Sequence, residues 1–278
     1  MRMIRSRSLR VLVGVSALVV MTAGTAEAKT VPQEPKNPTR PVAVYGPKGH
    51  PVIERSISGI QGDEADDSGY LYAGAGQRVS NDGTRADITV AKPNLAPGDD
   101  HTLAEIAVES ADGQQIVEVG WTVGAGDPEP RLFVYHWVNN QETCYNGCGY
   151  VQTSTRHTPG EKLPLGVQEF RIQHFSGRWN LGYGGEWFGY FPDSLWDGRY
   201  TSSGLVQWFG EVNAASSTRT CTDMGNGQPA SSNSAASFKI SFFNGASVNT
   251  DTYATNSSFY SIRKQDSQTL RFGGGGAC

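Results

Sequence analysis

Two stretches of the chain alternate apolar and polar residues with the period of a β-strand. In residues 115–123, valine and tryptophan occupy alternate positions, and Glu118 occupies one of the positions between them. Successive side chains of a strand point to opposite faces of a sheet. The pattern therefore predicts one apolar face directed at the core and a second face that carries Glu118. Residues 205–213 repeat this pattern, with Gln207, Phe209 and Glu211 on the face away from the core.

From residue 69 onward the chain reads as short strands separated by turns. Further strands are predicted at residues 69–73, 85–91, 104–109, 131–138, 149–155, 168–174, 178–183, 186–191, 237–243 and 258–263. Hairpin turns are expected at Asp112-Gly113, Ser176-Gly177 and Gly184-Gly185, and one short helical turn at Pro192-Asp193-Ser194. Many short strands and almost no helix predict an all-β fold. We expect a jelly-roll-like antiparallel β-sandwich with a concave active-site groove.

The first 68 residues differ from the rest in composition. Four arginines precede an uncharged stretch and an Ala-Glu-Ala cleavage site, which is the pattern of a secretory signal peptide over residues 1–28. Residues 29–68 are rich in proline and acidic residues and are interpreted as a short leader or pro-segment. Residues 69–278 then form one domain. We expect a secreted, extracellular monomer without a membrane anchor.

The charge of the exported chain limits its partners. Loss of four arginines and one glutamate with the signal peptide takes the formal charge from −4 to −7. A mildly acidic secreted protein is a poor candidate for binding nucleic acid or anionic membranes.

The cysteine count predicts disulfides. All four cysteines lie in the exported part, and the local pairing joins Cys144 to Cys148. This pairing leaves Cys221 with Cys278, which would fasten the glycine-rich C-terminal tail to the body. A zinc site is the alternative, but the C-x-x-x-C spacing and the scattered histidines disfavour it. We expect neither a metal nor a cofactor.

Glutamate chemistry remains after the common catalytic motifs are excluded. The chain has no G-x-S-x-G, no H-E-x-x-H and no phosphate-binding glycine motif, and His136 and His174 are interpreted as sheet-surface residues. Glu118 and Glu211 on one face could share a proton, so that one donates to a substrate carbonyl and the other activates water. Solvent-facing glutamates are common on secreted sandwiches, however. The same alternation holds for Glu105, Glu109, Glu169 and Glu186.

A series of local motifs resembles the neprosin domain, in order, from Tyr70 to the C-terminus. The motifs are V-E-V-G-W-T-V at 117–123, R-L-F-V-Y at 131–135, C-Y-N-x-C at 144–148, G-Y-V-Q-T-S at 149–154, W-F-G-Y-F-P at 187–192, V-Q-W-F-G-E-V at 206–212 and T-x-M-G-N-G at 222–227. The resemblance implies a secreted glutamic peptidase with a β-sandwich fold that cuts after proline at acidic pH without metal. Its catalytic glutamates would be Glu118 and Glu211. The family's cysteine pairs match those expected above.

The resemblance also directs attention to the surroundings of the pair. Phe209 stands where the family pattern has a glycine, so the groove beside Glu211 differs in shape. Gln152 and Gln207 are the polar candidates for substrate binding, and Tyr190 is the aromatic candidate for stacking on a proline ring. The expected substrate is a peptide or protein, with proline-rich sequences as candidates.

Two other functions are compatible with this pattern. A glycoside hydrolase would use the same carboxylates on glycan. A secreted carbohydrate- or surface-binding module would carry the glutamates as spectators.

Overall fold

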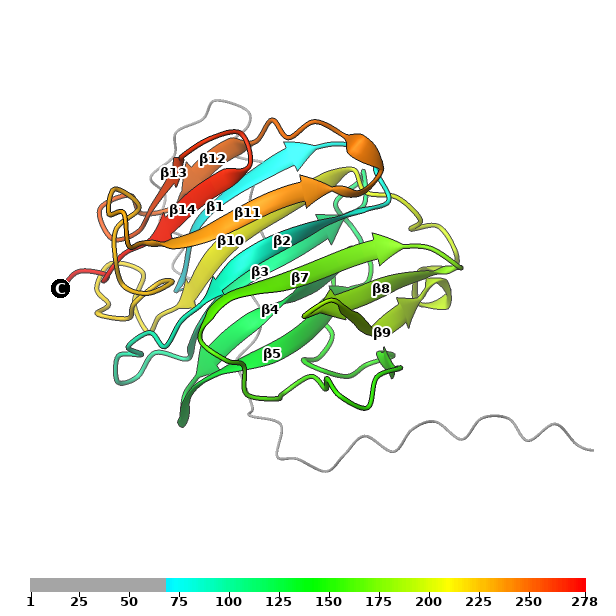
Figure 1. Cartoon of the computed structure of the whole chain (residues 1–278). Helices are drawn as coiled ribbons and strands as arrows, with labels where there is room; N and C mark the ends of the chain where they lie inside the picture. Colours follow the sequence, from blue (N-terminus) through cyan, green and yellow to red (C-terminus); the bar gives the residue numbers. More distant parts are fainter. Residues whose placement is uncertain (1–68) are drawn as a thin grey trace, which may run out of the picture. The chain divides into compact units, whose positions relative to one another are not determined.

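The computed structural model describes residues 69–278, so the predicted signal peptide (1–28) and leader (29–68) lie outside the described residues. Within 69–278 the chain forms two antiparallel sheets that pack face to face (Figure 1). The expected all-β sandwich with almost no helix is therefore confirmed. None of the helices in this part of the chain is long and apolar enough to cross a membrane.

The first sheet has six strands and the second has eight. In spatial order the first contains β12 (Asp251–Ala254), β1 (Tyr70–Arg78), β10 (Leu205–Asn213), β3 (His101–Glu109), β4 (Ile116–Gly124) and β5 (Asp127–Trp137). The second contains β13 (Ser261–Lys264), β14 (Thr269–Gly273), β11 (Ala236–Phe242), β2 (Gly83–Val90), β7 (Gly166–His174), β8 (Arg178–Tyr183), β9 (Glu186–Pro192) and β6 (Val151–Gln152). Two short 3₁₀ helices complete the described part, η1 (Asp193–Trp196) and η2 (Phe243–Gly245).

All twelve predicted strands form, and the predicted helical turn is η1. The three hairpin turns join β3 to β4, β7 to β8 and β8 to β9, as expected. The prediction missed β12 and β14, which have four and five residues. Such short strands show too few periods of alternation to stand out from a loop.

The main core lies between the sheets. It receives the apolar faces of β4 and β10, and both Trp121 and Trp208 are fully buried in it. The opposite face of the first sheet, directed away from the second sheet, is here called the site face. The site face carries a second buried cluster rather than a polar, solvated surface. Its members are Tyr72, Leu103, Ala107, Ile116, Phe133, Tyr135, Trp137, Leu205, Phe209 and Tyr253.

The prediction that His136 lies on the sheet surface is wrong. Its side chain is on the core face of β5, with Leu132 and Val134, and the residue is only 1 % exposed. Its ring centroid lies 4.4 Å from that of Phe191. His174 is partly exposed at the end of β7, as expected for a surface residue.

Both expected disulfides are present. Cα–Cα distances are 5.7 Å for Cys144–Cys148 and 5.3 Å for Cys221–Cys278, within the range that disulfides span. The second bond fixes the C-terminal tail, and Ala277 N–H also donates to the carbonyl oxygen of Thr220. The glycine-rich tail is therefore part of the folded body.

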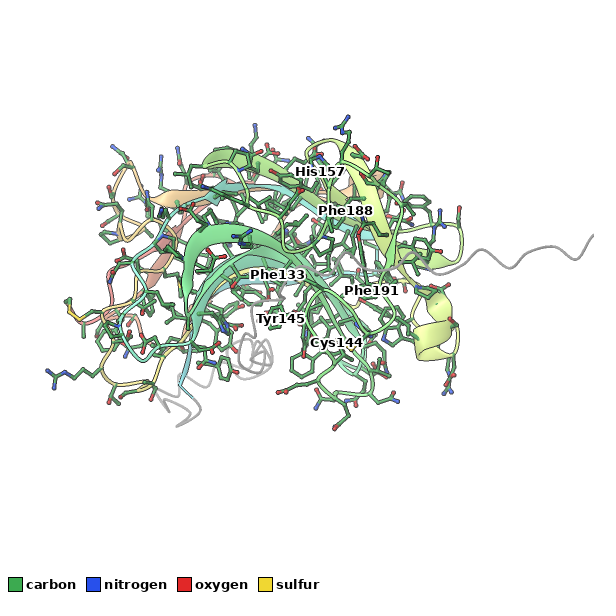
Figure 2. All side chains as sticks on the ribbon, turned by 90° about the horizontal axis from the view of Figure 1, so that it is seen from below. Phe133, Cys144, Tyr145, His157, Phe188 and Phe191 are labelled. Atoms are coloured by element: carbon green, nitrogen blue, oxygen red, sulfur yellow. A yellow bond between two sulfur atoms is a disulfide. The ribbon has the colours of Figure 1, made fainter. Side chains whose placement is uncertain are left out.

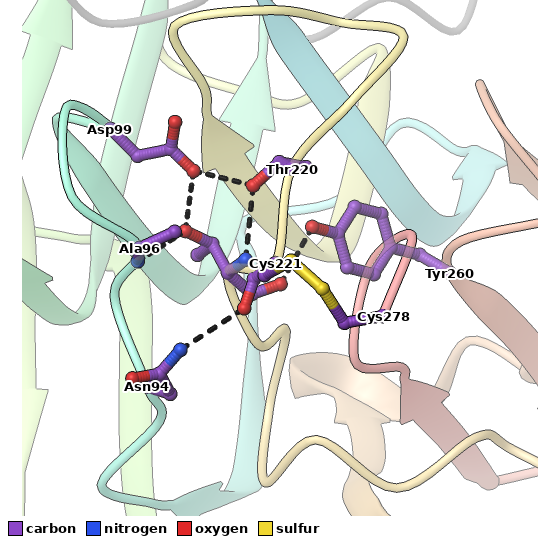
Figure 3. The surroundings of a disulfide bond; sticks show 8 residues. Asn94, Ala96, Asp99, Thr220, Cys221, Tyr260 and Cys278 are labelled. Atoms are coloured by element: carbon purple, nitrogen blue, oxygen red, sulfur yellow. Dashed lines mark hydrogen bonds between the residues drawn. A yellow bond between two sulfur atoms is a disulfide. The ribbon is translucent and has the colours of Figure 1, made fainter.

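A buried carboxylate organises the chain beside this disulfide (Figure 3). Asp99 Oδ2 accepts hydrogen bonds of 2.5 Å from the hydroxyls of Thr220 and Thr222, and Asp99 Oδ1 accepts the N–H of Ala215 at 2.8 Å. These bonds join the segment before β3 to the loop after β10. The start of β3 is fixed in this way.

Candidate active site

Strand register places Glu118 and Glu211 on the site face. Glu211 in β10 is opposite Leu103 in β3, which is opposite Thr122 in β4. Directly opposite residues of antiparallel strands point to the same side of the sheet. Thr122 is four residues from Glu118, an even number, so the two glutamates share this face.

A third glutamate lies between them. Glu105 in β3 is opposite Gly120 on one side and Phe209 on the other, one step along the sheet from both Glu118 and Glu211. Such diagonal neighbours are about 7–8 Å apart. Glu118 and Glu211 are two strands and four residues apart, which places their Cα atoms roughly 16 Å apart on a flat sheet.

The hypothesis of a shared proton concerns the carboxylate groups rather than the Cα atoms. A proton shared directly between Glu118 and Glu211 requires carboxylates a few ångströms apart. In the register, Glu105 lies between the strand positions of Glu118 and Glu211.

Gly120 makes room for Glu105. A Cβ at position 120 would lie 2.7 Å from the Cβ of Glu105 and 2.2 Å from the backbone oxygen of Ala104. Real Cβ contacts do not come this close, so no other residue fits without displacing β3. The close packing against β3 therefore requires glycine at position 120 of the E-V-G-W stretch.

Tyr145 lies against the site face, above the glutamates. Its ring makes edge contacts with Phe133 and Tyr135, at centroid distances of 5.6 and 5.0 Å. Figure 2 shows Phe133 and Tyr145 on the concave side of the arched first sheet. The disulfide Cys144–Cys148 flanks the tyrosine, and Asn146 fixes the loop to β5 because its side chain accepts the N–H of Val134 at 3.0 Å.

The charges of all three glutamates act on the Tyr145 hydroxyl. Burial raises its pKa well above the ordinary range, and the charges of Glu211, Glu105 and Glu118 raise it further. The hydroxyl therefore keeps its proton at every pH at which a protein works. It is therefore a neutral group exposed to the charges of three glutamates.

Each of the two predicted glutamates has a different neighbour. Trp137 donates its indole N–H to Glu118 Oε1 at 2.9 Å. His101 Nε2 lies 2.8 Å from Glu211 Oε1, and its other ring nitrogen lies 2.7 Å from Asp100 Oδ2. Glu118 thus meets a neutral donor, and Glu211 meets a group that can carry charge.

Of the predicted substrate-binding residues, the structure brings Gln207 to the site face. Gln207 lies in the same row as Glu118, two strands away. Its amide nitrogen donates to Glu109 Oε1, and its amide oxygen accepts from the hydroxyl of Tyr253 at 3.0 Å. Both ends of this amide are therefore held in place.

Gln152 and Tyr190 lie in the second sheet instead and are not brought together with the glutamates. Gln152 Nε2 donates to Ser154 O at 2.7 Å, a bond within its own loop. Tyr190 packs under the guanidinium of Arg178, 4.3 Å from the ring centroid. Alternation predicts that a segment is a strand but not which of the two sheets the strand joins. It therefore could not place Gln152 or Tyr190.

Four polar residues of the site face are fully buried. Glu105, Glu118 and Glu211 are each 0 % exposed, and Gln207 is also 0 % exposed. A substrate could reach these carboxylates only after they become accessible.

Comparison with known families assigns the chain to a family. A family model described as Neprosin matches residues 98–275, which include every strand from β3 to β14. The chain belongs to the neprosin family. Membership of the neprosin family is consistent with a hydrolase that acts on peptides. The matched segment carries Glu105, Glu118, Tyr145 and Glu211 together.

One solved structure is also similar to this neprosin-family chain. It is CG-16, a homodimeric agglutinin from chicken liver, with 8 % identity, a TM-score of 0.30, and coverage of 50 % of this chain and 92 % of the agglutinin. At this TM-score the similarity supports no conclusion about the fold or function.

Sequence reasoning missed three residues of the site. Glu105 showed the right alternation but nothing separated it from the other glutamates, and His101 looked like one of several scattered histidines. Tyr145 appeared only as part of a motif. No signal for His101 was available, because the strand predicted at 104–109 begins after it. Its contact with Glu211 depends on the pairing of β3 with β10.

Proposed function

We propose that this chain is a secreted glutamic endopeptidase that hydrolyses peptide bonds at acidic pH. The observation that carries the proposal is the common face of Glu118 and Glu211, two strands apart, with the neutral Tyr145 hydroxyl within electrostatic reach of both. Membership of the neprosin family supports the peptidase class.

The residues of the site face supply the parts that water-mediated hydrolysis needs. One glutamate takes a proton from water as the water oxygen attacks the carbonyl carbon, and the other gives a proton to the leaving nitrogen. The Tyr145 hydroxyl donates to the oxyanion that forms on the former carbonyl oxygen. Proton transfers through carboxyl groups explain an acidic optimum, because one of the two must be protonated.

The aromatic residues of the site face support a preference for proline. Tyr72 and Phe209 pack edge to face at 5.7 Å, next to the position of Glu211 in the sheet. Rings of this kind offer a flat surface to a pyrrolidine ring. They take the role that the sequence assigned to Tyr190.

We further propose that residues 69–278 are the peptidase unit and residues 29–68 a pro-segment. The support is the composition of 29–68, which is rich in proline and acidic residues. We expect the full-length secreted chain to be latent. A form beginning near Gly69 is expected to be active.

The test is digestion of a defined, unfolded protein by the processed form between pH 2 and 7, with the fragment termini sequenced. Glu118→Gln and Glu211→Gln should each lower kcat by roughly 10²–10⁴-fold, the usual contribution of a general acid or base. Glu186→Gln is the matched control, because Glu186 lies in the second sheet and contacts Arg156 at 3.0 Å. This control should keep full activity.

Other outcomes would select another function. Release of sugars from polysaccharide, lost in the same two variants, would favour the glycoside hydrolase. Tight ligand binding that survives both substitutions, without turnover of any substrate, would favour the binding module. Cleavage by both variants at the wild-type rate would refute the glutamate mechanism.

A further inference from the structure

His101 joins two carboxylates at the end of the site face. Nδ1 lies 2.7 Å from Asp100 Oδ2, and Nε2 lies 2.8 Å from Glu211 Oε1. The imidazole and the Glu211 side chain are 0 % exposed, whereas the Asp100 side chain is 32 % exposed. The three groups form a hydrogen-bonded series from the surface to the predicted catalytic carboxylate.

The two contacts require two protons. A neutral imidazole has one N–H donor and one acceptor nitrogen, and an ionised carboxylate is an acceptor only. Either His101 carries both protons and both carboxylates are ionised, or one carboxyl is protonated. With fewer protons, a nitrogen lone pair would face a carboxylate oxygen at hydrogen-bond distance. Full burial makes that unpaired contact costly.

The fold fixes His101 in this position. Asp100 N–H donates to the carbonyl oxygen of Asn213 at 3.0 Å, which pairs the start of β3 with the end of β10. Asp99, one residue further back, is held by the hydroxyls beside the Cys221–Cys278 disulfide (Figure 3). The backbone that carries His101 is therefore anchored, and the two ring contacts orient the imidazole.

Among the described residues, the other titratable side chains on this face of the neighbouring elements include acids, phenols and a paired cation. Tyr70 of β1 lies 6.4 Å from the imidazole between ring centroids. The remaining groups are Tyr72 of β1, Glu105 of β3, Tyr145 of the loop after β5, and Arg131 of β5, whose Nε donates to Asp127 at 2.6 Å. His101 is the basic group that a hydrogen bond joins to Glu211.

We propose that His101 is a positioning residue that, as an imidazolium, holds Glu211 ionised and so makes Glu211 the base and Glu118 the acid. This assignment rests on the proposed peptidase function and deepens it. Asp100 in turn stabilises the imidazolium. Glu118, which accepts from the neutral indole of Trp137, is the member that carries a proton when substrate binds.

The proton balance of the reaction follows from this assignment. Glu211 takes a proton from water, whose oxygen bonds to the carbonyl carbon as the carbonyl electron pair moves to oxygen. That pair returns as the carbon–nitrogen bond breaks, and Glu118 gives its proton to the leaving nitrogen. Glu211 then releases its proton to solvent through His101 and Asp100, and Glu118 takes up another. The net reaction consumes one water and no free proton.

The test is the pH profile of kcat/KM for peptide cleavage, which reports the essential acid and base of the free enzyme. His101→Gln keeps a hydrogen-bond donor for Glu211 but removes the positive charge. The acid limb, where the base takes up a proton, should then move to higher pH by about one unit, a tenfold change in proton affinity. KM should change less than kcat, and the alkaline limb should stay in place.

Two further variants complete the design. Trp137→Phe removes the donor to Glu118 and should move the alkaline limb and leave the acid limb in place. His157→Gln is the matched control, because its Nδ1 makes a similar contact of 2.8 Å, to Glu161. Figure 2 shows His157 away from Tyr145, toward the second sheet, and its replacement should leave both limbs unchanged.

The outcomes separate this inference from the function on which it rests. Absence of wild-type cleavage at every pH would overturn both. If the wild type is active and His101→Gln leaves the acid limb unmoved, the inference alone is overturned. If His101→Gln shifts the alkaline limb, Glu211 is the acid instead. If His101→Gln does not fold, Asp100→Asn tests the proposal from the partly exposed end of the Asp100–His101–Glu211 series. It should move the acid limb in the same direction, and an unmoved limb would refute the proposal.

Discussion

His136 should make the fold lose stability as the pH falls. Its imidazole is 1 % exposed and packs against Phe191 at 4.4 Å and Trp196 at 5.7 Å between ring centroids. Burial lowers its pKa to about 4 from the ordinary value of 6.5. The cause is that the charged imidazolium loses its hydration in the core.

The sign and size of the effect follow from this shift. Because the folded pKa is below the unfolded one, the stabilisation from the neutral imidazole is fully present above about pH 6.5 and is lost as the pH falls toward 4. In this window the unfolded chain binds about one more proton, which costs about 1.4 kcal/mol per pH unit. Between pH 7 and pH 4.5 the expected loss is about 2.5 kcal/mol. The protein would therefore carry this cost at the acidic pH proposed for its activity.

The assay is urea unfolding, with disulfides intact, of the wild type and His136→Phe at pH 7 and pH 4.5. Phenylalanine keeps a ring against Phe191 and cannot titrate, and Thr143 retains its bond to the backbone oxygen of residue 136. The free energy of unfolding of the wild type should fall by about 2.5 kcal/mol more than that of the variant over this interval. Equal losses in both proteins would refute the reasoning, because every other titrating group is common to the two.

Three further predictions concern the site and its supports. Gly120→Ala should destabilise the fold by about 3 kcal/mol or more and abolish peptidase activity, because the new Cβ would lie 2.2 Å from a backbone oxygen of β3. Gly275→Ala, whose Cβ would make an ordinary contact of 3.6 Å, should stay close to wild type in the same melts, and equal effects of the two would contradict the argument. Replacing the Cys221–Cys278 pair by serine should lower the free energy of unfolding in urea by about 4 kcal/mol, since the bond closes a loop with a sequence separation of 57. Replacing the Cys144–Cys148 pair, with a separation of 4, should lower it by about 2 kcal/mol. The reverse order of losses would show that loop length does not govern them. Tyr145→Phe should lower kcat by about 10²-fold with little change in KM, and an unaltered kcat would exclude its hydroxyl as the oxyanion donor.

Much of the fold followed from local patterns. Alternation in residues 115–123 and 205–213 identified β4 and β10, their buried faces and the opposite faces that carry Glu118 and Glu211. Cysteine number and spacing gave both disulfides. These features depend on residues close in sequence, or on a compartment in which an even number of thiols is oxidised.

The same patterns gave wrong or incomplete results where the outcome depends on distant neighbours. His136 alternates like a surface residue but lies on the core face, and Tyr190 sits in the second sheet. His101 was indistinguishable from other histidines because its contact with Glu211 spans 110 residues of sequence.

The sequence by itself determined that this protein is built from short strands, that two of them carry glutamates on their non-core faces, and that the chain resembles the neprosin domain. Only the tertiary structure decided that β3 lies between these strands. That pairing puts Glu105 between the two carboxylates and His101 in contact with one of them. The physical reason is that strand periodicity is a local property of the backbone, whereas register is set by hydrogen bonds between segments far apart in the chain.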